Sequence, residues 1–219
     1  MATHTPRFDE RLEIASAVVM ALSALMSSWA SYQAALWDGE QAANYSRANA
    51  LRIQASREAT RADMRQVAEL GEFQQWLNAD ARGDASLARF YRSRLPADLR
   101  PAFNAWMDQA PMRNPSAAPT PFVMPQYRPQ ERTRAAGLDR QADATFDRGQ
   151  YDNAVSDAFV QSSTIMATAL FFGGIGQVFK VRSARVGLLV IAVLALVVGA
   201  GRLLGLPLQI LGFGPPTPG

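Results

Sequence analysis

Three stretches of the chain contain no charged residue, and they constrain the fold more than any other feature of the sequence. They cover residues 14–37, 158–179 and 186–201. A helix needs roughly 20 mostly apolar residues, at about 1.5 Å per residue, to cross the hydrocarbon core of a bilayer. The first two stretches are long enough, and the third continues past Arg202 to Leu206. We therefore predict an all-α membrane protein with transmembrane helices at 14–37, 158–179 and 186–206.

A cleaved signal peptide is the alternative interpretation of the first stretch. Ser28, Trp29 and Ala30 form a weak small-residue cleavage site. However, residues 7–13 contain more acidic than basic side chains, whereas a signal peptide begins with a basic segment. The helical pattern also continues past Ala30 without a break. We therefore favour an uncleaved span.

The formal net charge of +3 is concentrated beside the predicted spans. Residues 38–157 contain equal numbers of arginines and acidic residues, and the excess of positive charge lies in Lys180, Arg182, Arg185 and Arg202. This distribution is typical of a topology signal and argues against a nucleic-acid-binding surface. Short basic loops stay in the cytoplasm. The loop 180–185 therefore predicts cytoplasmic residues 1–13, with residues 38–157 and the C-terminal tail 207–219 outside, which in a bacterial inner membrane means the periplasm.

The extramembrane segment 38–157 is predicted to form a long helical hairpin. Its first arm, ending near residue 70, is rich in alanine and carries apolar residues three and four positions apart. Gly71 is expected to break or kink this arm. Its second arm runs from Gln130 into the second span without a proline. At about 1.5 Å per residue the arms reach roughly 50 and 40 Å, which is similar enough for them to pair.

Residues 72–129 are predicted to form a small helical cap on this hairpin. We expect two or three short helices, one of which ends at Pro96 while another has Pro101 in its first turn. Closely spaced prolines then exclude a regular helix from residues 111–129, the proline strap. The strap is either a connector that packs on the aromatic residues of the cap, which we favour, or a peptide recognised by a proline-binding domain.

Several short motifs resemble those of a known group of proteins. Residues 99–106, Asn114-Pro115 and residues 121–127 are similar to a stretch shared by uncharacterised bacterial inner-membrane proteins. These proteins have a similar three-span layout and a Trp-Asx-Gly-Glu segment after the first span, here residues 37–40. The resemblance covers nearly the whole chain. It implies the three-span layout but no activity and no functional residues.

The residues that usually carry catalysis are scarce in this chain. His4 is the only histidine and there is no cysteine, which excludes thiol chemistry and cysteine-based zinc sites. Asp139, Asp143 and Asp147 form an acidic stripe that matches a stripe of Arg57, Arg61 and Arg65. For both stripes we favour a solvated face with local pairs such as Glu58–Arg61, ahead of contacts between subunits. We predict no catalytic residue, no cofactor and no metal site.

Small residues recur at every fourth position of the first span and of the residues that follow it. Small residues let helix backbones approach closely, and this is the usual basis of helix association in lipid. The stripe either joins neighbouring chains or packs the three spans of one chain together. In the last span, two glycines are separated by the same four positions. The predicted packing residues are Ser23, Ser27, Ser31, Ala35 and Gly39, with Gly201 and Gly205.

The predicted membrane boundaries carry aromatic and basic residues. Trp29, Tyr32 and Trp37 are typical of an aromatic belt at the outer interface. Arg202 is the only charged residue inside a predicted span. It lies close to the end of that span, so an arginine that extends toward the outer headgroups explains it better than an ion path does.

Two functional hypotheses follow from these patterns. The first is a non-enzymatic, membrane-anchored scaffold or accessory subunit that forms a homo-oligomer or binds a membrane-complex partner. The second is an oligomeric channel or transport component. Transporters usually bury ionisable groups near the middle of the membrane, whereas the centres of these spans hold only small polar and apolar residues. We therefore favour the scaffold over the channel, and both over an enzyme.

Overall fold

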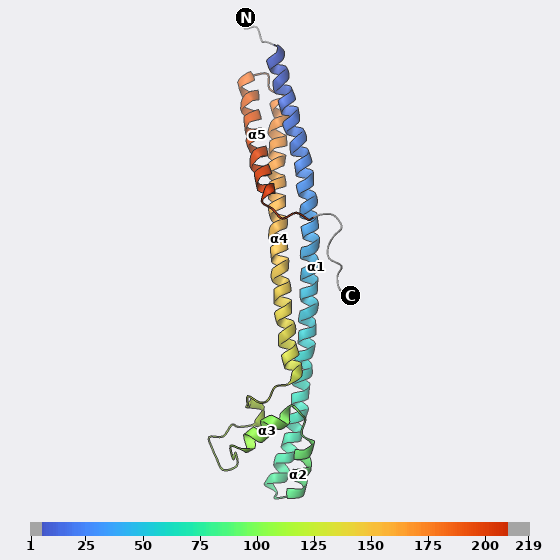
Figure 1. The fold of residues 1–219 in the computed structure, drawn as a ribbon, viewed down its shortest axis with the longest axis vertical. Helices are drawn as coiled ribbons and strands as arrows, with labels where there is room; N and C mark the ends of the chain where they lie inside the picture. Colours follow the sequence, from blue (N-terminus) through green and yellow to red (C-terminus); the bar gives the residue numbers. More distant parts are fainter. Residues whose placement is uncertain (1–5, 210–219) are drawn as a thin grey trace. The chain divides into compact units, whose positions relative to one another are not determined.

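The computed structural model describes residues 6–209 of the chain, and it is helical throughout this range. The helices are α1 (Pro6–Ala81), α2 (Ala85–Arg94), α3 (Leu99–Met107), α4 (Gln130–Gly176) and α5 (Arg182–Leu204), with a short 3-10 helix, η1 (Pro121–Val123) (Figure 1). No strand is present in residues 6–209, so the all-α prediction is confirmed there. Parts of the predicted terminal segments, residues 1–5 (with His4) and 210–219, lie outside the described residues.

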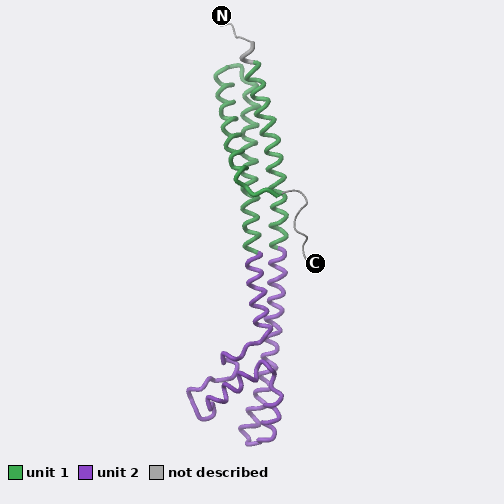
Figure 2. The backbone as a smooth tube through the Cα atoms, viewed as in Figure 1, with its two compact units in different colours: residues 1–45, 146–219 green, residues 46–145 purple. Residues whose placement is uncertain are grey.

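Three of the helices are long and apolar enough to cross a membrane. They are α1, α4 and α5. The first and third charge-free stretches lie within α1 and α5, and the second begins within α4 and runs past its end at Gly176. The chain divides into two compact units, as Figure 2 shows. Unit 1 comprises residues 1–45 and 146–219, and unit 2 comprises residues 46–145.

In unit 1, α1, α4 and α5 lie side by side (Figure 1). The buried face of α1 repeats every seven residues, at Ser16, Ser23, Ala30 and Trp37. A seven-residue repeat keeps one seam of a helix in contact with a neighbouring helix. The small members of this seam allow close backbone approach. The apolar core of the unit combines the three helices and includes Ala30, Ala34 and Trp37 of α1, Val155, Phe159 and Met166 of α4, and Leu203 of α5.

In unit 2 the buried positions of α1 again recur every seven residues, in a register that begins four residues after the buried Asn44. The buried positions are Ala48, Ala55, Ala62 and Glu69 on α1, and Ala135 and Ala142 on α4. Ion pairs join the two helices: Arg52 to Asp143, Arg132 to Asp63 and Arg65 to Glu131. Because rising residue numbers on α1 meet falling numbers on α4, the two segments are antiparallel.

An aromatic cluster forms the apolar core of unit 2, where the end of α1 meets α2 and α3. The rings of Trp76 and Phe103 lie edge to face with centroids 4.7 Å apart, and those of Phe73 and Trp106 with centroids 5.3 Å apart. Of the break or kink expected at Gly71, the break is wrong, since α1 continues to Ala81, and the kink stays a prediction. One glycine weakens a helix by about 1 kcal/mol. Burying two aromatic side chains directly after it stabilises the helix by more than that.

Local signals define the short elements of unit 2. The carboxylate of Asp84 accepts a hydrogen bond from the backbone N–H of Leu87 at 3.0 Å and caps the start of α2. Leu95, directly before Pro96, ends this helix. The proline strap packs on the aromatic cluster through Trp106, whose indole N–H donates to the carbonyl of Ala118 at 2.6 Å. Apart from η1, residues 111–129 contain no regular helix.

Candidate interaction surfaces

The predicted small-residue stripe of the first span divides between two faces of α1. Ser23 is fully buried. The hydroxyls of Ser27 and Ser31 both contact the Ser163 hydroxyl of α4, at 2.9 and 3.0 Å. Ala35 and Gly39, in contrast, are exposed. Each step of four residues rotates the stripe by about 40°, so its later members leave the seam with α4, and their contact with another chain stays a prediction.

On α5, neither glycine of the predicted pair packs closely against another described helix. Gly201 is exposed, and a Cβ at this position would meet nothing within 4 Å. Gly205 is the residue that ends the helix. A glycine that the sequence pattern did not single out makes the close contact instead: a Cβ on Gly199 would lie 2.7 Å from the terminal methyl of Met166. The role of Gly201 and Gly205 in association is therefore still a prediction.

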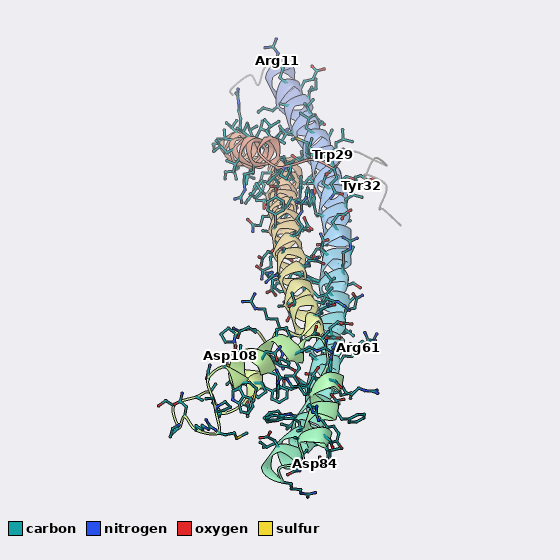
Figure 3. All side chains as sticks on the ribbon, turned by 60° about the horizontal axis from the view of Figure 1, so that its bottom comes forward. Arg11, Trp29, Tyr32, Arg61, Asp84 and Asp108 are labelled. Atoms are coloured by element: carbon teal, nitrogen blue, oxygen red, sulfur yellow. The ribbon has the colours of Figure 1, made fainter. Side chains whose placement is uncertain are left out.

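The predicted interface residues differ in their surroundings. Trp29 and Tyr32 are exposed and project outward from α1 (Figure 3), with ring centroids 6.1 Å apart. Trp37 is buried and packs edge to face on Tyr151. The guanidinium of Arg202 donates to the side-chain carbonyl of Gln161 at 2.9 Å. Lys180 precedes α5, whose first turn contains Arg182 and Arg185.

Two buried polar contacts in unit 1 were not predicted. Gln33 is fully buried, and its amide both donates to the backbone carbonyl and accepts from the backbone N–H of Gln209, each at 2.9 Å. Asn44 donates to the buried carboxylate of Asp152 at 2.7 Å. An amide within a charge-free stretch was the only sequence signal for the first contact. No sequence signal indicated the contact of Asn44 with Asp152, because the two residues lie 108 positions apart.

In unit 2 a single guanidinium joins three carboxylates. Arg65 contacts Glu69 of α1 at 3.1 Å, Asp98 before α3 at 3.3 Å and Glu131 of α4 at 3.0 Å. The Tyr127 hydroxyl donates to the same Glu69 carboxylate at 2.7 Å. Burial raises the pKa of Tyr127, and its hydrogen bond to Glu69 raises it further. This ion-pair network therefore fixes the proline strap and the start of α4 to α1.

Glu131 in this network has a pKa below its ordinary value. The first cause is its own backbone N–H at the start of α4, which hydrogen-bonds the carboxylate. The second is Arg65, and together they outweigh the opposing effect of burial. The charged form of Glu131 is therefore favoured in the folded chain.

The two charged stripes predicted from the sequence form local and interhelical pairs. The expected pair of Glu58 and Arg61 is present. Asp143 of the acidic stripe pairs with Arg52 at 3.3 Å. Within residues 6–209, no group of three or more metal-ligating side chains lies close enough to hold an ion.

An apolar stripe runs along the side of α1 that faces away from α4 in unit 2. We call it the outer stripe, and it comprises Ile53, Met64, Val67 and Leu70. These side chains are between 40% and 71% exposed. At about 100° per residue, Ile53, Met64 and Val67 lie opposite the buried alanines at 48, 55 and 62. This part of α1 therefore has one apolar face that is covered by α4 and another that no described residue covers.

Comparisons with models of protein families, with curated proteins and with solved structures find no match to this chain.

Proposed function

We propose that this protein is a non-enzymatic scaffold anchored in the bacterial inner membrane, and that it acts by self-association. In this proposal α1, α4 and α5 contribute the three spans. The N-terminus and the loop 180–185 lie in the cytoplasm. The paired helices and the cap of residues 38–157 lie in the periplasm. The basic loop supports this orientation, and the resemblance to bacterial inner-membrane proteins is in keeping with it.

The outer stripe is the observation that carries the proposal. Val67 is 71% exposed and Met64 is 69% exposed, so these two large apolar side chains lie on the surface of unit 2. Exposed apolar side chains on one face of a segment outside the membrane, as at Met64 and Val67, are typical of a protein interaction site. A helix with apolar residues on two opposite sides is suited to contacting a second helix besides α4.

A second copy of the chain is the occupant that the surrounding charges favour. Copies anchored in one membrane share one orientation, so two α1 helices meet in parallel, with equal residues at equal heights. A two-fold axis then places the same surface of both chains in contact. Helical spacing puts Arg57 and Arg61 on one flank of the outer stripe and Asp63 on the other. Each basic flank therefore faces the acidic flank of the partner, in addition to the pairs that Arg61 forms with Glu58 and Asp63 forms with Arg132 within the chain.

Native mass measurement of the gently extracted protein tests this proposal. We expect more than one copy per particle, and we expect Val67→Glu to weaken association by about tenfold or more, because it replaces an apolar contact with a charge. Ala136→Glu is the matched control, since Ala136 is exposed on α4 and helical spacing turns it away from α1. This control should associate like the wild type.

Crosslinking locates the contact independently. The chain has no cysteine, so Met64→Cys introduces a single thiol on the outer stripe. Oxidation should join two copies through residue 64 but not through the control Ala136→Cys. Wild-type particles that contain one chain and no copurified protein would contradict the scaffold proposal. Particles that contain a different protein instead of a second copy would contradict self-association.

A further inference from the structure

A hollow between α2 and α3 of unit 2 is lined only by polar residues. Its volume is about 470 Å³, and three of its five lining residues are arginines. The two helices can be found in Figure 3 from the labels of Asp84, which precedes α2, and Asp108, which follows α3. The lining residues are Arg89, Arg92 and Ser93 of α2, with Arg100 and Asn104 of α3.

The three arginines of this hollow have no carboxylate partner. Within residues 6–209, no ion pair includes Arg89, Arg92 or Arg100. Arginines at positions 52, 61, 65, 132, 134 and 148 each pair with an acidic side chain, whereas several others, such as Arg94 and Arg113, form no ion pair among the described residues and are not gathered around a hollow. What distinguishes the hollow is that three guanidinium groups without an ion pair among the described residues line one space.

Neutral acceptors nevertheless hold all three guanidinium groups in place. Arg89 donates to the carbonyl of Ala85 at 3.1 Å, Arg92 to the side-chain carbonyl of Asn104 at 3.1 Å, and Arg100 to the carbonyl of Leu95 at 2.9 Å. Arg92 also lies over the ring of the buried Phe103. Each guanidinium carries five N–H donors, so donors remain for a ligand after these bonds are made. Fixed side chains lose less conformational entropy on binding than free ones.

The ligand that fits this donor set is a tetrahedral oxyanion. Arginine pairs with phosphate through two parallel N–H···O bonds, which are stronger than bonds between neutral groups. Three guanidinium groups around one hollow can serve the several oxygens of a phosphate, whereas a carboxylate offers two oxygens in one plane. We propose that the hollow binds a phosphate group, carried either by a small soluble molecule or by a lipid headgroup.

Isothermal titration of the full-length chain in a neutral detergent tests the proposal, with inorganic pyrophosphate as the probe. We expect saturable binding that weakens as salt is added. Arg89→Gln and Arg100→Gln should each raise the Kd about tenfold, because each removes charge-assisted hydrogen bonds. Arg113→Gln removes the same charge from an exposed position in the proline strap and should leave the Kd unchanged. Arg92→Gln is a third variant, used if near-ultraviolet circular dichroism shows that the aromatic cluster is intact.

Two further probes identify the source of the phosphate. Short-chain phosphatidylglycerol presents the same chemistry as a lipid headgroup, and tighter binding of this probe than of pyrophosphate assigns the site to lipid. The reverse order assigns it to soluble phosphates. Absence of saturation by either probe up to about 10 mM, which corresponds to a very weak Kd, would overturn the proposal. An equal loss of binding in Arg113→Gln would also overturn it. So would binding of a short DNA duplex by a chain that binds neither small probe.

Discussion

At the residue scale, the polar contacts of this chain differ in how far they could be predicted. The pair of Glu58 and Arg61 follows from their separation along one helix. The pair of Arg65 and Glu131 does not, because Glu131 lies 66 residues away along the chain and reaches Arg65 only when α1 and α4 pair. Gln33 and Gln209 are 176 residues apart. Sequence patterns predict polar contacts within a turn or two, whereas these contacts depend on the tertiary fold.

The ion-pair network around Arg65 predicts a pH dependence of stability. The pKa of Glu131 is lower in the folded chain than in the unfolded chain. Its contribution to stability is therefore present above the unfolded pKa of about 4.3 and is lost as pH falls through the folded pKa. Between about pH 5 and about pH 3, we expect the thermal unfolding midpoint of the wild type to fall more steeply than that of Glu131→Gln.

A neighbouring acid on the same helix provides the control for this experiment. Asp139 is exposed and forms no ion pair within residues 6–209. Asp139→Asn should therefore unfold with the slope of the wild type. If wild type and Glu131→Gln lose stability in parallel as the pH is lowered, the ion-pair network does not have the assigned role.

At the scale of elements, the sequence predicted the kinds of helix better than the spacing of their contacts. Pro96 and the start of α4 at Gln130 were visible as local signals. The spacing of the helix contacts was not visible, because the first span contains small residues at every fourth position and also at Ser16, Ser23 and Ala30, which are seven residues apart. The seven-residue set holds the buried seam, since it stays on one side of the helix. Which set faces α4 depends on the residues that α4 itself presents, and the sequence of the first span alone does not contain this information.

Two glycines of α4 provide a test of this seam. A Cβ at Gly149 would lie 2.6 Å from the ring of Tyr45, which is itself stacked on Phe146. Gly149→Ala should destabilise the protein by about 1 kcal/mol, because overpacking costs about 1–3 kcal/mol while the gain in helix propensity offsets about 0.5–1 kcal/mol. In detergent, we expect a melting temperature a few degrees lower.

Gly137 is the matched control on the same helix. A Cβ there would meet nothing within 4 Å, so Gly137→Ala should only improve helix propensity and stabilise the protein by about 0.5–1 kcal/mol. The two substitutions are chemically identical but should have opposite signs. If Gly149→Ala also stabilises the protein, Tyr45 moves aside at little cost and the close approach of α1 and α4 at this point is unimportant.

At the scale of the whole molecule, the absence of charge over three long stretches predicted the helical membrane-protein class. That inference needs only the thickness of the bilayer and the rise of a helix. The interaction surfaces needed the structure. The outer stripe is visible only once α4 is known to cover the other side of α1. The arginine hollow is visible only once α2 and α3 bring their guanidinium groups together.

The proposed orientation in the membrane can be tested with single cysteines. Ser183 and Ser116 are both exposed in the structure, and the chain has no cysteine of its own. In intact cells, an impermeant thiol reagent should label Ser116→Cys but not Ser183→Cys, because the basic loop 180–185 is expected in the cytoplasm. Labelling of Ser183→Cys alone would reverse the proposed topology.

The contact of Gln33 with Gln209 has a consequence for biosynthesis. The ribosome makes Gln33 176 residues before Gln209. Until the last predicted span has been made and inserted, the amide of Gln33 lacks both of its backbone partners, and an unsatisfied amide is costly in an apolar environment. A nascent or truncated chain therefore exposes a polar group within its first predicted span that the finished chain hides.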